Sequence, residues 1–244
     1  MPGDANIASV AALMGEPARA TVLLALAGGR ALAASNLAAE ARVAPSTLSG
    51  HLTRLVDGGL ITVQTSGRHR YYRLGSPQVA DAVEALARIA PSQPVRSLGQ
   101  ATHAEAIRRA RTCYDHLAGR LGVALCDSLV SGGVLRVETA PDGPDDPVLG
   151  AGRAKRFVLT THGRDVLARL EVPLDPPTRR PLVRYCVDWS EQRPHISGWL
   201  GAALLKRFVT LGWVTRTERR VVRVNASGRS ALPEQLGVDP EALA

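Results

Sequence analysis

The stretch VAPSTLSGHLTRLVDGGLITVQTSGRHRYYRLG, residues 43–75, decides the fold of the N-terminal third of this sequence of 244 residues. Its first part predicts a helix from Pro45 to about Asp57. Proline is well tolerated in the first turn of a helix, and the glycine pair at 58–59 ends it. Three leucines at positions i, i+4 and i+7 of this helix predict one buried face: Leu48, Leu52 and Leu55.

Small and polar residues occupy the other faces of the same helix. Small hydroxyl side chains at the start of a helix allow it to approach a DNA duplex closely, and an arginine further along can bond a phosphate or a guanine edge. The candidate contacts with DNA on this helix are Ser46, Thr47, Ser49, Gly50, His51 and Arg54.

A basic hairpin follows the helix. Residues 60–65 and 70–74 predict two strands around a turn at 66–69. Arg68, His69 and Arg70 lie at or beside its tip, where positive side chains suit phosphates and groove edges. Exposed turns are polar in most proteins, so the hairpin alone indicates little. Preceded by predicted helices at 6–14, 16–27 and 33–41, it completes a helix, turn, helix and wing.

With these elements in place, residues 37–74 resemble the winged helix-turn-helix of ArsR-type bacterial transcriptional regulators. Their sequence is LAAEARVAPSTLSGHLTRLVDGGLITVQTSGRHRYYRL. The resemblance covers about residues 6–90. It implies a homodimer bridged by the first helix and by a helix at 76–89, whose apolar face holds Val79, Val83 and Leu86. It also implies that two recognition helices enter successive major grooves of a pseudo-palindromic operator in double-stranded DNA.

The sequence departs from this family at its usual metal sites. Many ArsR-type sensors carry Cys-x-Cys before the turn, but ALAASNLA at residues 31–38 has no thiol. Others place Asp and His ligands on the last helix of the domain, where this chain has only Asp81 and Glu84. Metal sensing therefore cannot be transferred from the resemblance, and an effector site is expected elsewhere in the chain.

The remaining two thirds of the chain contain an internal similarity. HLAGRLGVALCDSLVSGGVLRVE (116–138) aligns without a gap with HISGWLGAALLKRFVTLGWVTRT (195–217), and eight of the 23 positions are identical. We interpret this as a duplication. The fold class expected is mainly α with small β-hairpins (α+β): a winged helix-turn-helix domain at 1–90, a linker at 91–99, and degenerate winged-helix-like repeats at 100–172 and 182–240. A rival interpretation is that a helix followed by a hairpin is simply a common arrangement.

Glycines recur inside the aligned helices, at Gly119 and Gly122 and again at Gly198 and Gly201. Glycine in a helix interior costs about 1 kcal/mol relative to alanine. Close backbone approach explains its presence, and we expect the two helices to pack against each other about a pseudo-twofold axis.

This pseudo-symmetry would bring two similar clusters together. Thiolate, carboxylate and imidazole groups bind Zn²⁺ and softer ions or metalloids, so we consider six side chains as candidate metal ligands: Cys113, Asp115, His116, Cys186, Asp188 and His195. Three other interpretations stay open. The residues are structural, with the aspartates capping helices; or the thiols are oxidised; or a ligand pocket is lined by Tyr114, Trp189, Arg193 and Trp199, with Trp213. Cys126 aligns with Leu205 and is expected in the core.

Composition narrows the functional classes. The net charge of +8 and pI of about 10.2 favour an anionic partner such as nucleic acid. No signal pattern or membrane-spanning run is present, three cysteines are too few for a disulfide framework, and a cytoplasmic location is expected. No phosphate-binding loop, dinucleotide fingerprint or hydrolase motif indicates an enzyme.

We therefore expect a dimeric DNA-binding transcriptional repressor whose operator affinity is modulated by a metal, metalloid or small ligand at the C-terminal region. The cofactor, if one exists, would be a metal or metalloid ion held by thiolate and imidazole groups. The alternatives are a thiol-redox regulator and an architectural protein without effector. In the last case Arg216, Arg219 and Arg220 of the final hairpin would add contacts to DNA.

Overall fold

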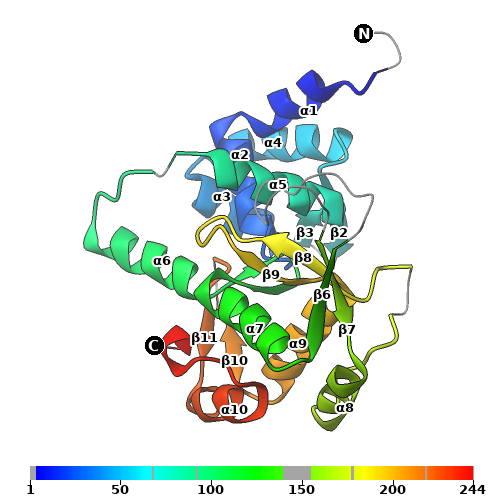
Figure 1. The fold of residues 1–244 in the computed structure, drawn as a ribbon. Helices are drawn as coiled ribbons and strands as arrows, with labels where there is room; N and C mark the ends of the chain where they lie inside the picture. The colour runs from blue at the N-terminus through cyan, green and yellow to red at the C-terminus, as the bar shows by residue number, and fades with distance from the viewer. Residues whose placement is uncertain are drawn as a thin grey trace. The chain divides into compact units, whose positions relative to one another are not determined.

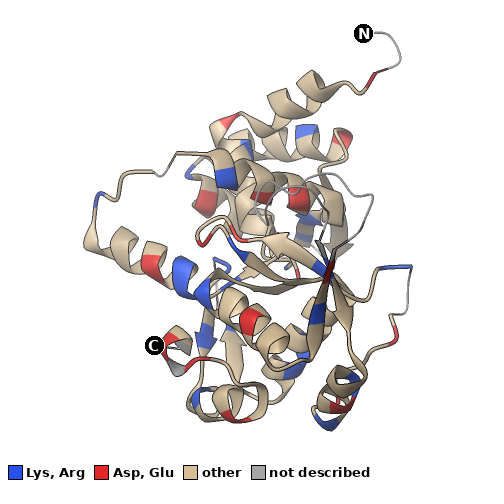
Figure 2. Cartoon of the chain, in the orientation of Figure 1, with Lys and Arg blue, Asp and Glu red and all other residues tan. Residues whose placement is uncertain are grey.

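The computed structural model describes residues 4–67, 69–91, 93–139, 155–176, 179–217 and 219–243 (Figure 1). The chain divides into two compact units, residues 1–83 and 84–244, and each is described by itself. The division falls inside helix α5 (Pro77–Ile89), and helix α6 (Leu98–Arg109) begins within the last residues of the predicted linker. Lys and Arg residues are spread along the backbone of both units (Figure 2).

The helices of the N-terminal unit begin and end close to the predicted residues. They are α1 (Ile7–Met14), α2 (Pro17–Leu26), α3 (Ala34–Ala41) and α4 (Pro45–Asp57). Proline occupies the first turn of α2 and α4, and the carboxylate of Glu16 accepts hydrogen bonds from the first amides of α2. Arg42, with a φ of 54°, ends α3 in the left-handed conformation and turns the chain toward α4.

A small antiparallel sheet forms the wing of this unit. Strands β1 (Leu32–Ala33), β2 (Ile61–Ser66) and β3 (His69–Leu74) are ordered β1-β3-β2. The predicted turn covers residues 66–69, but Ser66 pairs with His69. Each strand therefore extends one residue further into the turn than predicted. The N-terminal unit is therefore a winged helix-turn-helix, as the sequence predicts.

The leucine stripe of α4 anchors this helix in the N-terminal core. Leu48, Leu52 and Leu55 are all buried, together with Leu37 of α3 and Ile61 of β2. Burying a leucine side chain stabilises the fold by about 1.5–3 kcal/mol. This packing fixes which face of α4 points outward.

The C-terminal unit contains the same order of elements twice. Residues 111–169, the first half, form β4 (Arg111–Cys113), β5 (His116–Ala118), α7 (Gly119–Ser131), β6 (Leu135–Thr139), β7 (Lys155–Leu159) and α8 (Thr161–Arg169). Residues 184–236, the second half, form β8 (Arg184–Val187), β9 (Pro194–Ser197), α9 (Gly198–Thr210), β10 (Val214–Arg216), β11 (Val222–Val224) and α10 (Ala226–Leu236), and a 3₁₀ helix (Pro240–Leu243) follows. The hairpins β4–β5 and β8–β9, which precede the long helices, were not predicted from the sequence.

The two halves share one hydrophobic core. It includes Leu121, Cys126 and Leu129 of α7 and Leu205 and Phe208 of α9. Cys126 is 1% exposed and Leu205 is 2% exposed, which confirms that Cys126 is a core thiol. Helix α7 packs on β9, α9 packs on β5, and β5 lies beside β9, so the contacts between the halves are reciprocal.

In the part of the chain that the structure describes, no single helix has both the length and the hydropathy needed to cross a bilayer. Helices α1 and α2 meet both requirements only when taken together, and they are bent by 88° with respect to each other.

Candidate functional site

The outward face of α4 carries most of the predicted contacts with DNA. Ser46, Thr47, Ser49, Gly50 and Arg54 are exposed. They lie on the faces of α4 that the buried leucines leave toward solvent. The face presents small hydroxyl groups near its start and a guanidinium one turn from its end.

His51, the sixth predicted contact on α4, has a different environment. Its side chain is only 16% exposed, and its Nδ1 lies 3.2 Å from Oε2 of Glu16 at the start of α2. Arg19 of α2 also lies near the ring, with Nη1 at 3.5 Å from Nδ1. His51 therefore fixes α4 against α2, a structural role that the sequence analysis did not assign to it.

Two of the three predicted wing contacts lie on β3. His69 and Arg70 are exposed, opposite Ser66 and Thr65 on β2. Arg68, also predicted to contact DNA, lies outside the described residues.

Two helices of the predicted dimer surface expose apolar side chains. On α1, Ile7 is 74% exposed and Val10 is 41% exposed; on α5, Leu86 is 47% exposed and Ile89 is 81% exposed. Val83, which the sequence placed on this face, is buried instead. The exposed face of α5 is therefore shifted toward its C-terminal end.

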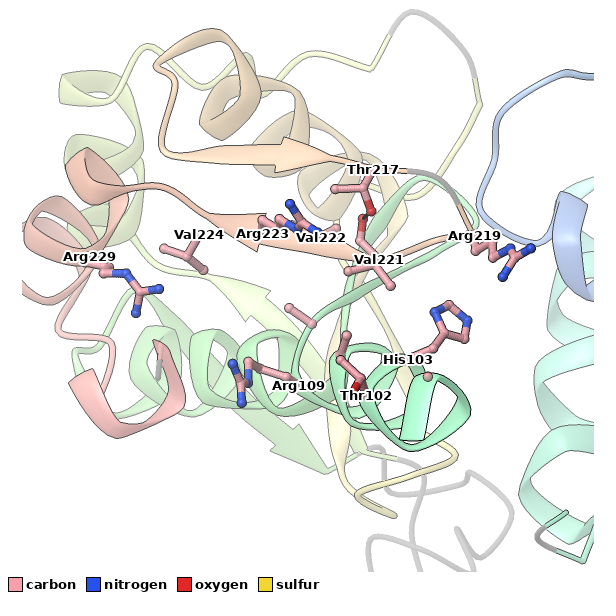
Figure 3. Close-up of a pocket in the computed structure, with 13 residues that line it drawn as sticks. Thr102, His103, Arg109, Thr217, Arg219, Val221, Val222, Arg223, Val224 and Arg229 are labelled. Carbon is pink, nitrogen blue, oxygen red and sulfur yellow. Dashed lines mark hydrogen bonds between the residues drawn. The ribbon is translucent and has the colours of Figure 1, made fainter. Parts of the chain in front are cut away.

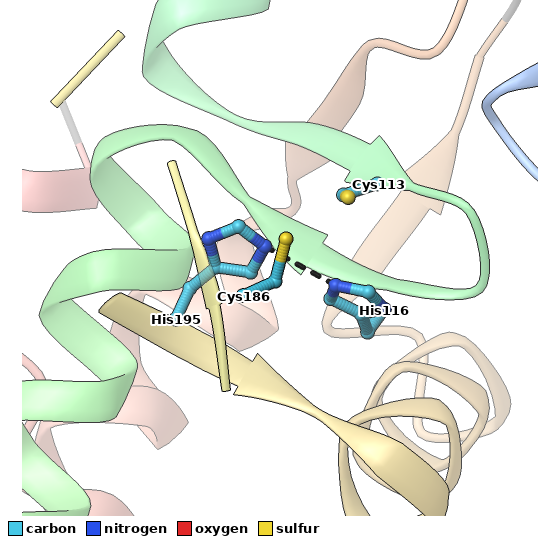
Figure 4. Close-up of side chains that lie close together, drawn as sticks. All are labelled: Cys113, His116, Cys186 and His195. Carbon is cyan, nitrogen blue, oxygen red and sulfur yellow. Dashed lines mark hydrogen bonds between the residues drawn. The ribbon is translucent and has the colours of Figure 1, made fainter. Parts of the chain in front are cut away.

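Four of the six predicted metal ligands meet inside the C-terminal unit. Cys113, His116, Cys186 and His195, hereafter the Cys/His cluster, each offer one ligand atom, and these atoms all lie within 4.8 Å of one another (Figure 4). Nε2 of His116 is 3.1 Å from Nε2 of His195. Three of the four residues are buried, and Cys186 is partly buried.

The other two predicted ligands, Asp115 and Asp188, lie behind the histidines. Oδ1 of Asp115 is 3.4 Å from Nδ1 of His116, and Oδ2 of Asp188 is 3.6 Å from Nδ1 of His195. Neither aspartate caps the helix that follows it in its own half. Asp188 instead accepts a hydrogen bond of 2.6 Å from the amide of Gly119, the first residue of α7 in the other half.

Each aspartate is held by an arginine. Nη2 of Arg111 lies 2.8 Å from Oδ2 of Asp188, with both side chains fully buried, and Arg180 makes two hydrogen bonds to Asp115. Burial is the largest single influence on Asp188 and would raise its pKa, but the Arg111 guanidinium, His195 and hydrogen bonds from Ser190 and the Gly119 amide together outweigh burial, and the pKa falls to about 2. Burial would also raise the pKa of Asp115, but Arg180 and His116 together outweigh it through their hydrogen bonds and charge, and the pKa falls to about 2. Both carboxylates are therefore ionised beside the imidazoles.

The two thiols of the cluster differ in acidity. The hydrogen bond with Cys113 lowers the pKa of Cys186, and the neighbouring imidazoles act in the same direction. The same hydrogen bond, together with burial, raises the pKa of Cys113. Burial opposes protonation of His116, but hydrogen bonds with Asp115 and Cys186 raise its pKa. The cluster thus favours Cys186 as its first thiolate.

Two helix glycines lie beside the histidines of the cluster. A Cβ at Gly201 of α9 would lie 3.0 Å from Cβ of His116, and a Cβ at Gly122 of α7 would lie 3.5 Å from Cβ of His195. Each would also collide with a backbone carbonyl of its own half, at Ile196 and Leu117 respectively. Both glycines therefore allow the close approach of a backbone carbonyl of their own half, and Gly201 also leaves room for His116 of the other half; the sequence analysis expected the other helix in this place.

The tryptophans of the predicted ligand pocket each contact a different partner. The Arg111 guanidinium lies 4.6 Å above the Trp189 ring, Nε1 of Trp199 donates a hydrogen bond to the carbonyl of Pro173, and Trp213 stacks on Phe208 in the core. Arg193, which we considered as an anion ligand, pairs with Asp127 at 2.9 Å. Tyr114 occupies the β4–β5 turn with a φ of 56°.

A cavity of about 790 Å³ lies elsewhere in the C-terminal unit and is lined by none of these aromatic residues (Figure 3). Helix α6, strand β11 and the start of α10 surround it. The described residues of its lining are rich in arginine, include a histidine and contain no acidic side chain: Arg109, Arg219, Arg223, Arg229 and His103. Valines of β11 supply an apolar floor.

Several residues around the Cys/His cluster were missed by the sequence analysis. Arg111 precedes Cys113 by two positions, as Arg184 precedes Cys186, so the repeated pattern Arg-x-Cys-x-Asp was an available signal. Glu84 of α5 and Arg220 had no such signal. The Glu84 carboxylate bonds the Arg220 guanidinium and lies 4.0 Å from Arg111. Arg220 is thereby turned inward, and the architectural alternative loses one of its expected contacts with DNA.

Comparison with known proteins agrees with this description of the chain. A family model described as a helix-turn-helix domain matches residues 14–64. YdfF from Bacillus subtilis strain 168, an HTH-type transcriptional regulator, is 37% identical over 236 residues, which are 96% of this chain and 98% of YdfF.

Two solved structures are similar over about a third of the chain. The homodimeric winged helix-turn-helix DNA-binding domain of Mb0332 from Mycobacterium bovis is 27% identical, with a TM-score of 0.31, over 36% of this chain and 88% of that domain. The cadmium sensor CMTR from Mycobacterium tuberculosis is 27% identical, with a TM-score of 0.30, over 37% of this chain and 98% of CMTR.

The relationship with YdfF extends over nearly the whole of both chains, and the motifs of the wing and recognition helix are those of ArsR-type regulators. Membership among regulators also confirms the prediction that the protein is not an enzyme. The chain belongs to the family of helix-turn-helix transcriptional regulators that contains YdfF, and its N-terminal winged helix resembles that of ArsR-type regulators.

Proposed function

We propose that the protein binds a pseudo-palindromic operator as a homodimer and represses transcription by covering the promoter. The observation that carries the proposal is the exposed polar face of α4, bordered by a basic wing. Helix α4 would enter the major groove with its N-terminal hydroxyl groups toward the base edges, and Arg54, Arg68 and Arg70 would contact phosphates or guanine.

The proposed dimer would use α1 and α5. Both helices expose large apolar side chains, led by Ile7 and Ile89, and exposed apolar patches of this kind mark interaction surfaces. A two-fold axis between copies would present two recognition helices to half-sites about one helical turn, or roughly 10 base pairs, apart.

We further propose that the C-terminal unit is the effector domain, built from two winged-helix-like repeats. A chain of buried polar contacts supports a route to the DNA-binding part. Asp188, beside His195, is paired with Arg111; Arg111 approaches Glu84; and Glu84 lies on α5, the helix proposed to join the two copies. A ligand that moves the Cys/His cluster would displace this helix and change the spacing of the recognition helices.

Selection of binding sites from random duplexes tests the DNA-binding part of this proposal. We expect two inverted half-sites, and we expect Arg54→Ala to weaken binding at least about tenfold, since a specific guanidinium contact is worth about 1–3 kcal/mol. Arg164→Ala removes an exposed charge from α8 and serves as the control. A recovered site without symmetry, or equal losses for both variants, would contradict the proposal.

A second candidate effector site is the arginine-lined cavity. Its guanidinium groups and its apolar floor suit an organic anion with a hydrocarbon part. A thermal-shift screen of carboxylates against the full chain tests this candidate, and stabilisation that disappears in Arg223→Ala would support it. Stabilisation that persists in this variant, or none at all, would count against it.

A further inference from the structure

We infer that Cys113, His116, Cys186 and His195 form a closed, four-ligand site for a Zn²⁺-class ion, with one Cys-His pair from each half of the C-terminal unit. This inference rests on the proposed effector domain and names its ligand. It assigns four side chains as ligands and gives Asp115 and Asp188 the role of positioning residues.

Strand register places the four ligands. Cys113 lies directly opposite His116 in the β4–β5 hairpin, and Cys186 lies directly opposite His195 in the β8–β9 hairpin. Opposed residues in an antiparallel pair project to the same face, with Cβ atoms about 4.5–5.5 Å apart. Each hairpin therefore presents one thiol and one imidazole together, and the neighbouring β5 and β9 bring the two presentations face to face.

The histidines are oriented as metal ligands. Asp115 and Asp188 lie next to the Nδ1 atoms, which favours the tautomer with the proton on Nδ1 and leaves a lone pair on each Nε2. The two Nε2 atoms point at each other across 3.1 Å. In that tautomer neither Nε2 carries a proton to donate to the other, so two lone pairs face each other, whereas a cation between them would be bonded by both.

A buried nitrogen without a partner supports the same conclusion. His195 is fully buried, and its Nδ1 has no hydrogen-bond partner, although Oδ2 of Asp188 lies only 3.6 Å away. Leaving such a group unsatisfied is costly. A small rotation of the ring toward a central ion would close this distance to a hydrogen bond.

The dimensions of the cluster are close to those of a tetrahedral site. Bond lengths of about 2.0–2.1 Å to nitrogen and about 2.3 Å to sulfur give edges of roughly 3.3 Å between nitrogens and 3.8 Å between sulfurs. The observed separation of the two Nε2 atoms is 3.1 Å, and all four ligand atoms lie within 4.8 Å of one another. Side-chain movements of a few tenths of an ångström to about 1 Å would therefore suffice.

The donor set selects the class of ion. Two sulfurs and two imidazole nitrogens are typical of Zn²⁺ and of ions that substitute for it, such as Co²⁺ and Cd²⁺. Two thiolates would neutralise a divalent ion, so the loaded site is electrically balanced in its buried position. Because the chain supplies all four ligands, no coordination position remains for a substrate, which is the arrangement of structural rather than catalytic zinc.

Metal titration of the reduced, full-length chain, prepared without an affinity tag that binds metal, tests the inference. We expect about one Co²⁺ per chain, with the visible d–d bands of a tetrahedral ion and a sulfur-to-metal charge-transfer band, and displacement of Co²⁺ by Zn²⁺. Cys113→Ser and Cys186→Ser should each abolish the tetrahedral d–d bands and weaken or remove the sulfur-to-metal charge-transfer band. Cys126→Ala, at the third and distant thiol, should preserve it.

Two further variants separate ligation from positioning. Asp188→Asn should keep the tetrahedral spectrum but weaken Zn²⁺ binding about 10–100-fold, as loss of an outer partner does. His195→Gln should lose the four-ligand spectrum, whereas the exposed His162→Gln should not. Circular dichroism of each variant checks that it folds.

Three results would overturn the inference: no metal bound by the folded, reduced chain; a spectrum unchanged in Cys186→Ser; or a Cys113–Cys186 disulfide as the only response of the cluster. Binding as predicted without any change in operator affinity would support the site and overturn its effector role. Failure of the site and failure of the proposed function are thus distinguishable.

Discussion

Replacing Gly201 by alanine tests the close packing of α9 against β9 of its own half and against His116 of the other half. Alanine in a helix interior is about 1 kcal/mol more favourable than glycine. At Gly201, however, the new Cβ would lie 2.4 Å from the carbonyl oxygen of Ile196 and 3.0 Å from Cβ of His116. Overpacking of this kind costs about 1–3 kcal/mol, and a backbone carbonyl yields less readily than a flexible side chain. Because the closest contact is with backbone, we take the upper part of this range, about 2–3 kcal/mol, and subtracting the gain of about 1 kcal/mol leaves a net loss of about 1–2 kcal/mol.

Gly50 of α4 provides the matched control. It also lies inside a 13-residue helix, but nothing is within 4 Å of a Cβ built there. Gly50→Ala should therefore stabilise the N-terminal unit by about 0.5–1 kcal/mol. The same substitution is predicted to have opposite signs at two helical positions.

Urea unfolding distinguishes the two effects. All three tryptophans, Trp189, Trp199 and Trp213, lie in the C-terminal unit, so their fluorescence follows that unit. With a slope of about 2 kcal/mol per molar urea, Gly201→Ala should lower the fluorescence midpoint by roughly 0.5–1 M. A fluorescence midpoint that is unchanged or higher would refute the packing argument. An equal loss of stability in Gly50→Ala would show that any glycine replacement has this effect.

Three other variants probe separate features. Arg54→Ala should leave Zn²⁺ affinity unchanged while reducing operator affinity at least about tenfold in fluorescence anisotropy, because the Arg54 guanidinium lies on the face of α4 proposed to contact DNA. Loss of both Zn²⁺ affinity and operator affinity would argue against separate functions of the two units. Arg111→Met leaves the Asp188 carboxylate buried without its guanidinium, so urea unfolding should show a loss of about 3 kcal/mol in the C-terminal unit. A loss below about 1 kcal/mol would mean that the other hydrogen bonds of Asp188 are enough to stabilise the buried carboxylate. Leu52→Ala, at a side chain 3% exposed, should cost about 2–5 kcal/mol in the N-terminal unit by circular dichroism; a near-neutral result would place α4 outside that core.

The N-terminal unit was largely predictable because its signals are local. The proline and glycine positions delimit α4, the leucine spacing fixes its buried face, and α5 begins within one residue of the predicted position. The role of His51 was not predictable, since its contact with Glu16 joins residues 35 positions apart that share no pattern in the sequence. The exposed face of α5 was misplaced because helical periodicity does not specify which neighbours cover Val83.

The Cys/His cluster was anticipated only through the internal similarity. Alignment of CYDH with CVDW suggested that the two groups meet, but not which atoms face each other. The hairpins that carry them have strands of three or four residues, too short for an alternating pattern to appear. The aspartates were grouped with the ligands because sequence proximity does not distinguish a group that faces an ion from one behind a histidine.

Anisotropy titration of the selected operator with reduced, full-length protein, with and without one equivalent of Zn²⁺, tests the central claim most directly. Coupling between effector and DNA typically changes affinity about 5–150-fold. We predict a change in this range for the unsubstituted chain and for Cys126→Ala, and none for Cys186→Ser. Identical operator affinities for the metal-free and Zn²⁺-loaded protein would contradict the account.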